Sequence, residues 1–157
     1  MTIAAPPVNY DTIVLERLYA ASPDRVFEAF ADPEARMRWG APSKETGLVY
    51  DEADFRVGGT DISRCGPRKN LVYRVEARYW DIVPNTRIVT SEVVSEGANR
   101  LSFSLITIEI EAAEGGAKLT LTDQIAAFGG KSMIDGSRAG FNAALDNLHA
   151  EFARQRP

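Results

Sequence analysis

Hydrophobic and polar residues alternate along most of the chain with the period of two that is typical of β-strands. This alternation is clear in residues 9–20 and continues, interrupted by turn-forming residues, from 48 to 125. Residues 131–155 follow a different rule, because their bulky apolar positions recur three and four residues apart, at Leu145, Leu148 and Phe152. The chain is therefore predicted to be mostly β-sheet and to end in one long amphipathic helix.

Two short helices are predicted between the first strand and the rest of the sheet. Ser22-Pro23-Asp24 combines an N-cap serine, a proline at the first helical position and an acid in the first turn. Asp32-Pro33-Glu34 repeats this signal, and the second helix is expected to end at about Trp39, before Gly40.

Six further strands are predicted after these helices, joined by short turns. They are Val49–Val57, Thr60–Cys65, Leu71–Ile82, Thr86–Val94, Leu101–Glu111 and Lys118–Ile125. Strands joined in this way are antiparallel neighbours, so they form a meander, to which the N-terminal strand adds a seventh member. Such a sheet has one face to bury, and the long helix is the element able to cover it. We therefore expect the sheet to curl around the final helix.

The inner face of this helix changes in side-chain size along its length. Its first half carries Ser137, Gly140 and Ala144, beside Met133 and Phe141. A glycine inside a helix costs about 1 kcal/mol relative to alanine, so its presence asks for a reason. Close approach of the helix backbone to a strand is one explanation, and a cavity beneath the helix is the other.

Composition and charge limit the classes of function. The chain has 157 residues, of which 45% are hydrophobic, and we expect a single domain over residues 1–157. The net charge is −4 and no basic stripe is present, so we expect no nucleic-acid partner. No segment is apolar enough to span a membrane, and residues 1–7 are too short for a signal peptide. The single cysteine fits a reducing compartment, so we expect a cytoplasmic protein.

Residues that could support catalysis or metal binding are few. His149 is the single histidine and lies on the helix face shared with Arg138 and Asp146, so we expect it to be exposed. With one histidine and one cysteine, the chain offers no ordinary zinc site, and we expect neither a metal nor a cofactor. Cys65 could be a nucleophile or a small buried hydrophobic residue, and the second reading is favoured.

The acidic residues are more numerous, but their roles differ. Asp51, Glu52 and Asp54 are predicted to be charges on an edge strand. Asp123 and Gln124, near the end of the last strand, could face the mouth of a cavity, and the sequence leaves open which of them does so.

Aromatic residues from separate elements could converge on one interior. They could simply fill the core, or they could line a mostly apolar pocket with a few polar groups that orient a ligand. The residues that we expect to line such a pocket are Trp39, Phe55, Tyr73, Tyr79, Phe103, Met133, Ser137 and Phe141.

Four segments carry a resemblance to a known superfamily. Residues 22–30, SPDRVFEAF, followed by Trp39, are similar to the opening motif of START-like proteins, also called SRPBCC or Bet v 1-like. Residues 79–90, YWDIVPNTRIVT, and 118–122, KLTLT, resemble the branch homologous to activators of heat-shock protein 90 ATPase. Residues 140–148 resemble the G-W-x-x-x-L-x-x-L helix of that branch, with phenylalanine where tryptophan is commoner.

This resemblance implies an α+β helix-grip fold. It consists of a seven-stranded curved antiparallel sheet wrapped around a long C-terminal helix, with two short helices between strands 1 and 2. The superfamily includes lipid and hormone carriers, polyketide cyclases and cochaperone domains, so fold alone does not select a function.

Three hypotheses follow for the function. The first is a monomeric or homodimeric protein that binds a hydrophobic or amphipathic small molecule between sheet and helix. The second is a cyclase- or dehydratase-like enzyme that uses the same pocket, with Asp123 or Tyr73 as acid or base. The third is a cochaperone-like interaction module, which needs an exposed apolar patch. The alternation leaves few exposed apolar residues apart from Trp80, and we expect binding rather than catalysis.

Overall fold

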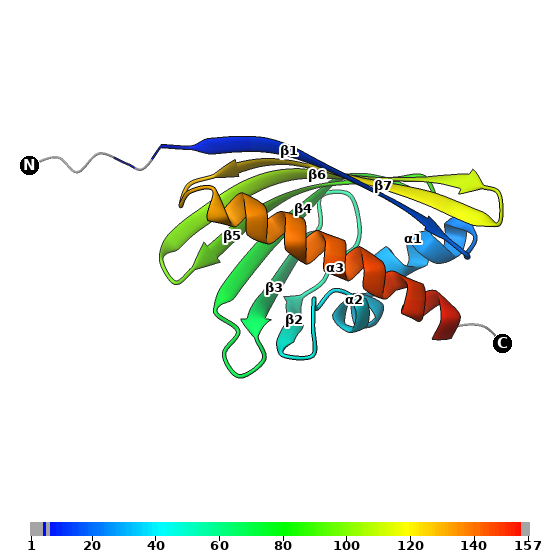
Figure 1. Ribbon diagram of the computed structural model, residues 1–157, viewed down its shortest axis with the longest axis horizontal. Coiled ribbons are helices and arrows are strands. Elements are labelled where there is room, and N and C mark those ends of the chain that lie inside the picture. The colour runs from blue at the N-terminus through cyan, green and yellow to red at the C-terminus, as the bar shows by residue number, and fades with distance from the viewer. Residues whose placement is uncertain (1–4, 6, 155–157) are drawn as a thin grey trace, which may run out of the picture.

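The computed structural model describes residue 5 and residues 7–154, and its element order is the predicted one (Figure 1). The elements are β1 (Asn9–Tyr19), α1 (Pro23–Ala31), α2 (Pro33–Trp39), β2 (Thr46–Glu52), β3 (Thr60–Pro67), β4 (Tyr73–Val83), β5 (Arg87–Glu96), β6 (Asn99–Ala113), β7 (Gly116–Ala127) and α3 (Ser132–Arg154). The predicted end of the last helix at Gln155 lies outside the described residues.

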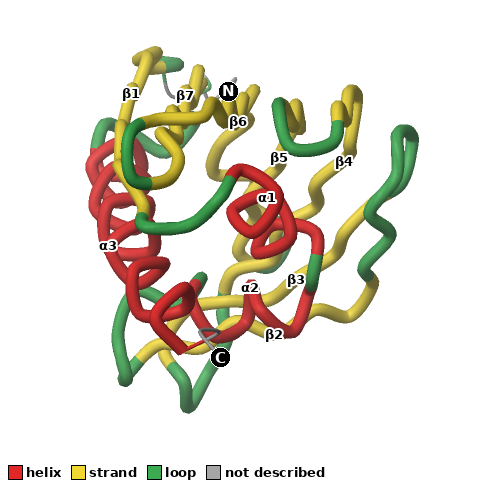
Figure 2. The backbone as a smooth tube through the Cα atoms, turned by 90° about the vertical axis from the view of Figure 1, so that its right-hand side faces the viewer, coloured by secondary structure: helices red, strands yellow, loops and turns green. Residues whose placement is uncertain are grey.

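Within the described chain, seven strands form one antiparallel sheet in the order β1-β7-β6-β5-β4-β3-β2. The consecutive strands β2 to β7 are the predicted meander, and β1 pairs with β7 along its whole length, from Asn9 opposite Ala127 to Tyr19 opposite Ala117. The sheet curls, with α3 across its concave side and with α1 and α2 at one end (Figures 1 and 2). The α+β helix-grip fold is confirmed.

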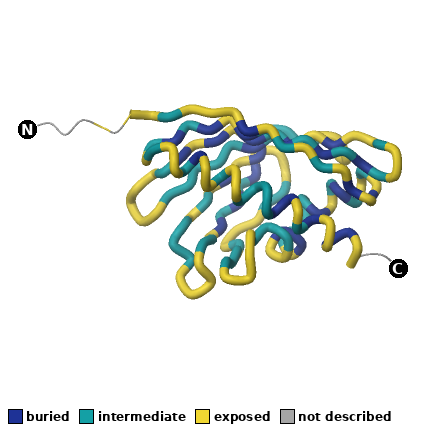
Figure 3. Tube along the Cα trace, in the orientation of Figure 1, coloured by how far each residue is buried: buried dark blue, intermediate teal, exposed yellow. Residues whose placement is uncertain are grey.

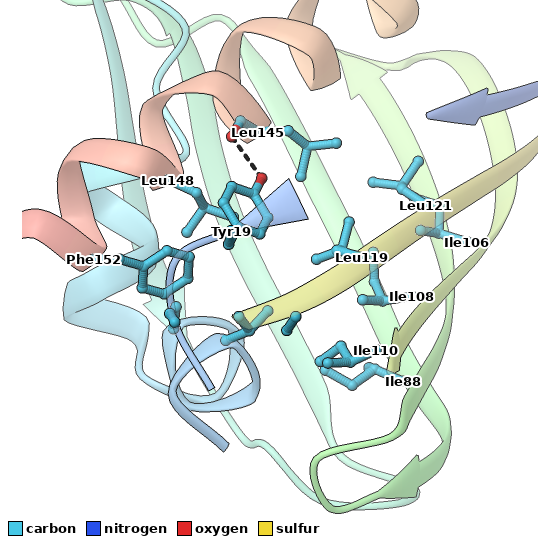
Figure 4. Close-up of a cluster of buried hydrophobic side chains, with 14 of the residues drawn as sticks. Tyr19, Ile88, Ile106, Ile108, Ile110, Leu119, Leu121, Leu145, Leu148 and Phe152 are labelled. Atoms are coloured by element: carbon cyan, nitrogen blue, oxygen red, sulfur yellow. Dashed lines mark hydrogen bonds between the residues drawn. The ribbon is translucent and has the colours of Figure 1, made fainter. Parts of the chain in front are cut away.

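The second half of α3 packs tightly on the sheet. Leu145, Leu148 and Phe152 are buried together with Tyr19 and inward-facing residues of β5, β6 and β7 (Figure 4). The Tyr19 hydroxyl donates a hydrogen bond of 2.6 Å to the Leu145 carbonyl oxygen. Along α3, most buried positions lie in this half, and exposed or half-buried positions dominate the first half (Figure 3). The predicted apolar stripe therefore anchors the helix at one end.

The strand predicted at 49–57 ends early, at Glu52. The Asp61 carboxylate accepts a hydrogen bond of 2.8 Å from the Asp54 amide, and the chain turns between Asp54 and Gly59. A Cβ atom at Gly59 would lie 2.1 Å from the Asp54 carbonyl oxygen, so this turn requires glycine. The turn directs Phe55 toward the interior, where its ring meets that of Tyr79 at 5.0 Å.

The outer face of the sheet carries more apolar surface than the sequence indicates. Besides Trp80, its exposed large hydrophobic residues include Tyr10, Val14, Leu18, Phe103 and Leu105. Tyr10 and Phe103 both lie opposite Ala126, so they are close on this face. The expectation of few exposed apolar residues is therefore wrong. None of the helices described is long and apolar enough to cross a membrane.

Candidate functional site

A cavity of about 730 Å³ lies between the concave face of the sheet and α3. It exists because α3 rests mainly on α2 and on β1 at the edge of the sheet, and stands away from the central strands. Its walls come from α2, from the inward-facing residues of β2 to β7 and from the first half of α3. The volume falls in the range of about 300–1,000 Å³ that is usual for small-molecule sites.

The roof of the cavity is the part of α3 with small side chains. Gly136, Ser137, Gly140 and Ala144 all line it. A Cβ atom added at Gly136 or Gly140 would meet no atom within 4 Å, so no strand approaches the helix closely there. These glycines face open space, and the cavity explanation for them is the one that the geometry supports.

The predicted pocket residues meet at this cavity, with one exception. Those that line it are Trp39, Phe55, Tyr73, Tyr79, Met133, Ser137 and Phe141. Trp39 is held in place because its indole N–H donates a 3.0 Å hydrogen bond to the Ala29 carbonyl oxygen and its ring packs on Phe30 at 4.9 Å.

Phe103 does not line the cavity. It lies on the outer face of β6 with 44% of its surface exposed, while Ser102 and Ser104 on either side point inward and line the cavity. The prediction for Phe103 is corrected for this reason: successive strand residues face opposite sides, and the small serines leave room beneath the helix.

An ion pair fixes one side of the cavity floor. Arg36 of α2, 7% exposed, places its Nη1 2.6 Å from the Asp61 Oδ2 atom of β3. The Tyr79 hydroxyl donates a hydrogen bond to the same oxygen. The guanidinium also lies over the Tyr50 ring, 4.4 Å from its centre, and burial raises the pKa of Tyr50 to about 12. This network attaches α2 to the sheet.

Two further carboxyl groups lie on the floor, at Glu92 of β5 and Asp123 of β7. The pKa of Glu92 is raised to about 7, mainly by burial. The negative charges of Asp123 and Asp61 raise it further, and the positive charge of Arg36 opposes them.

Asp123 has no exposed surface, and burial raises its pKa. The Ser104 hydroxyl is near enough to oppose this shift, but neither carboxylate oxygen of Asp123 makes a hydrogen bond within the described part of the chain. The neighbouring Gln124 is exposed. Of the two residues that could face the cavity, Asp123 is therefore the one that does so.

The remaining candidates have little catalytic character. His149 is exposed, as expected, and its ring packs on Tyr19 with 4.7 Å between the ring centres. Cys65 lines the cavity, but burial and the charge of Glu92 raise the pKa of its thiol, which disfavours the nucleophilic thiolate. The described residues contain no cluster of three or more potential metal ligands.

Sequence reasoning missed Arg36, Asp61 and Glu92. One signal was available for Glu92, because it lies two residues after Thr90 and therefore shares its face of the strand. Arg36 had no such signal, since its partner Asp61 is distant in the sequence and an arginine on a short helix normally reads as exposed.

Comparisons with known proteins place this geometry in a family. Structures similar to the chain include an uncharacterised protein from Rhizobium leguminosarum, with 34% identity, a TM-score of 0.83 and coverage of 95% of this chain and 98% of that one. The Mll3558 protein from Rhizobium loti has 38% identity, a TM-score of 0.77 and coverage of 92% and 99%. An AHSA1 protein from Silicibacter pomeroyi, with 20% identity, a TM-score of 0.76 and coverage of 93% and 100%, shares the fold.

No curated protein matches the chain. The family model described as Activator of Hsp90 ATPase homolog 1-like protein matches residues 20–153, a span that includes α1, α2, the β2–β7 meander and almost all of α3. The chain therefore belongs to the family of Activator of Hsp90 ATPase homolog 1-like proteins.

Proposed function

We propose that the protein binds a hydrophobic or amphipathic small molecule in the cavity beneath α3. The observation that carries this proposal is the open space at Gly136 and Gly140 above a cavity of about 730 Å³. Burial of apolar surface is worth about 25 cal/mol per Å², so a cavity of this size with mainly apolar walls can bind an apolar molecule by removing both surfaces from water. The fold also commonly binds hydrophobic ligands.

The composition of the walls supports the same proposal. Aromatic and aliphatic residues form most of the lining, and polar groups are confined to the floor and to a few hydroxyls such as those of Ser137 and Thr90. An apolar enclosure binds the body of a ligand, and a few fixed polar groups orient it.

The test is a titration of the purified protein with Nile red, a neutral apolar dye whose fluorescence rises on leaving water, together with native mass spectrometry. A ligand at about 100 times its Kd stabilises the folded state by about 2.7 kcal/mol, so binding must also raise Tm. Absence of a co-purified molecule, of dye binding and of any Tm shift across a lipid and aromatic library would refute the proposal.

A second candidate is an enzyme of the cyclase or dehydratase kind. The observation that favours it is the buried carboxyl of Asp123, whose raised pKa suits proton transfer to a reactive intermediate in the same cavity. Turnover of a polyketide-like substrate by the wild type and its loss in Asp123→Asn would support this candidate. Unchanged turnover in the variant would remove Asp123 from the chemistry.

A cochaperone-like role has one observation in its favour, namely the exposed apolar residues Tyr10 and Phe103 on the outer face. Stimulation of a chaperone ATPase that is lost in Phe103→Ser would support it. Equal stimulation by the variant, or none by the wild type, would speak against it.

A further inference from the structure

The charges on the cavity wall do not balance. Among the described residues that line the cavity, one arginine faces three carboxyl groups, those of Asp61, Glu92 and Asp123. Asp61 already pairs with Arg36 and accepts the Tyr79 hydroxyl. Within the described chain, Glu92 and Asp123 therefore form no ion pair, and the charge of Arg36, which acts on Glu92, is already shared with Asp61.

These two carboxyl groups converge on one region of the floor. Glu92 of β5 lies opposite Ser104 of β6, and Asp123 of β7 lies opposite Ile106, two residues further along the same strand. One strand thus separates them, a spacing of about 4.8 Å on each side, and both side chains are on its concave face. The charge of Asp123 acts on Glu92, which also indicates that the two are close.

Asp123 supplies an independent sign of a missing partner. Its side chain is fully buried and lines the cavity. The Ser104 hydroxyl lies near it, but within the described part of the chain neither carboxylate oxygen accepts a hydrogen bond of ordinary geometry. A buried carboxyl in this state is costly, and a donor on a ligand in the cavity would remove that cost.

Resting on the binding function proposed above, we propose that the ligand carries a basic nitrogen, a protonated amine whose N–H groups are directed to Glu92 and Asp123. The amine forms charge-assisted hydrogen bonds to the carboxylates, and its apolar body occupies the space below Gly140. The aromatic faces around the cavity, including Tyr73 and Phe141, favour a cation as well.

The electrostatics around Glu92 make this recognition dependent on pH. The other titratable or charged groups on the cavity wall are Arg36, Tyr50, Asp61, Cys65, Tyr73, Tyr79 and Asp123. The described residues of α3 that line the cavity add no titratable group. Because the pKa of Glu92 lies near 7 without a ligand, acidification protonates this carboxyl and removes its attraction for an amine.

The experiment compares three ligands with the same tail, namely decylamine, decanol and decanoate, each competing with Nile red for the cavity. At about pH 8 we expect decylamine to bind at least about tenfold more tightly than decanol, and decanoate to bind most weakly. At about pH 6 the advantage of the amine over the alcohol should shrink several-fold, because Glu92 is then largely protonated.

Glu92→Gln should bring the affinities for decylamine and decanol at about pH 8 close together, and this ratio is read whatever the change in affinity for Nile red. Glu96→Gln, which removes the same charge from an exposed position at the end of the same strand, should keep the preference for the amine. The pH comparison uses the wild type alone, so it tests the role of Glu92 even if the Glu92 variant fails to fold.

The two proposals fail in different ways. If Nile red binds and decanol or decanoate competes as well as decylamine at about pH 8, the amine proposal is overturned and the binding function stands. If neither Nile red nor any of the three compounds binds, the binding function fails and the amine proposal fails with it.

Discussion

Gly140 lies at the centre of the cavity roof, and its replacement separates packing from ligand binding. Gly140→Leu places a side chain in open space, so the gain in helix propensity should raise the free energy of unfolding by up to about 1 kcal/mol. The same side chain occupies the proposed ligand space and should weaken Nile red binding by about tenfold or more. Denaturant unfolding and dye titration measure the two effects.

The matched control is Ala139→Leu, one residue away on the exposed side of the helix. It should leave dye affinity unchanged. A loss of several kcal/mol in Gly140→Leu would show instead that the glycine is tightly packed, contrary to the open space above it.

Glu92 should lower the stability of the unliganded protein as the pH rises. An unperturbed glutamate has a pKa of 4.5, and that of Glu92 in the folded protein is raised to about 7, so the folded state holds the proton more tightly. The contribution of Glu92 to the free energy of unfolding is therefore fully present below about pH 4.5. It is lost as the pH rises through about 7, because the carboxyl must then ionise in the interior. Glu92→Gln removes this loss, so the variant should be more stable than the wild type by about 1–3 kcal/mol at about pH 8 and no more stable at about pH 4.

Unfolding curves of both proteins at several pH values measure this difference. Glu96→Gln serves as the control, because the same change of net charge at an exposed site should give no trend of this size. A difference between the Glu92 variant and wild type that stays constant across the pH range would contradict the raised pKa.

At the scale of elements, the attachment of α2 to the sheet depends on a buried ion pair. Asp61→Ala leaves the Arg36 guanidinium and the Tyr79 hydroxyl without their shared acceptor in the interior. Removal of one partner from a buried pair typically costs about 3–5 kcal/mol, because the remaining charge is uncompensated. We expect a loss of that size in the unfolding free energy, measured by urea denaturation.

The comparison is the exposed pair between Asp51 and Arg64 on β2 and β3, with 2.8 Å between Oδ2 and Nε. Asp51→Ala removes the same type of side chain but should cost less than about 1 kcal/mol, since water solvates both groups. Equal costs for the two variants would mean that the Arg36 pair contributes no more than a surface pair.

The spacing of hydrophobic residues in the sequence predicts the helices and strands well, because it follows which face of each element is buried. The strands, the proline-led starts of α1 and α2 and the long α3 all follow from local residues. The turn at 53–59 does not, because the Asp61 carboxylate that holds it accepts from Asp54 across the turn. Local pattern alone continues the strand there.

The site was less predictable than the fold for a related reason. In β6, Ser102 and Ser104 share a face with Ile106, whereas Phe103 and Leu105 share the opposite face with the polar positions that follow. The alternation over the whole strand therefore places Phe103 outside, and its aromatic character taken alone is misleading. The structure follows this alternation, and the small side chains of Ser102 and Ser104 line the cavity. Arg36 was missed because its burial depends on a partner that no local pattern reveals.

At the scale of the whole molecule, the two halves of α3 should differ in stability. The second half is fixed by buried Leu148 and Phe152, by the bond from Tyr19 and by the Arg38–Glu151 ion pair, with 2.5 Å between Nη2 and Oε1. The first half spans the cavity and has fewer packed neighbours beneath it. Local opening follows such differences in packing, so backbone amides of residues 136–143 should exchange with solvent at least about tenfold faster than those of 145–152.

Ligand binding in the cavity should reduce this difference in exchange rate by slowing exchange in the first half of α3 alone. Saturation with Nile red fills the space under the first half of α3, so exchange should slow in residues 136–143 and stay nearly constant in 145–152, as followed by hydrogen–deuterium exchange with mass spectrometry. The β1 strand, none of whose residues lines the cavity, is the internal reference. Protection concentrated in β1 would place the dye on the exposed apolar face around Tyr10. Apolar molecules would then bind to that outer face and not beneath the helix at Gly136 and Gly140.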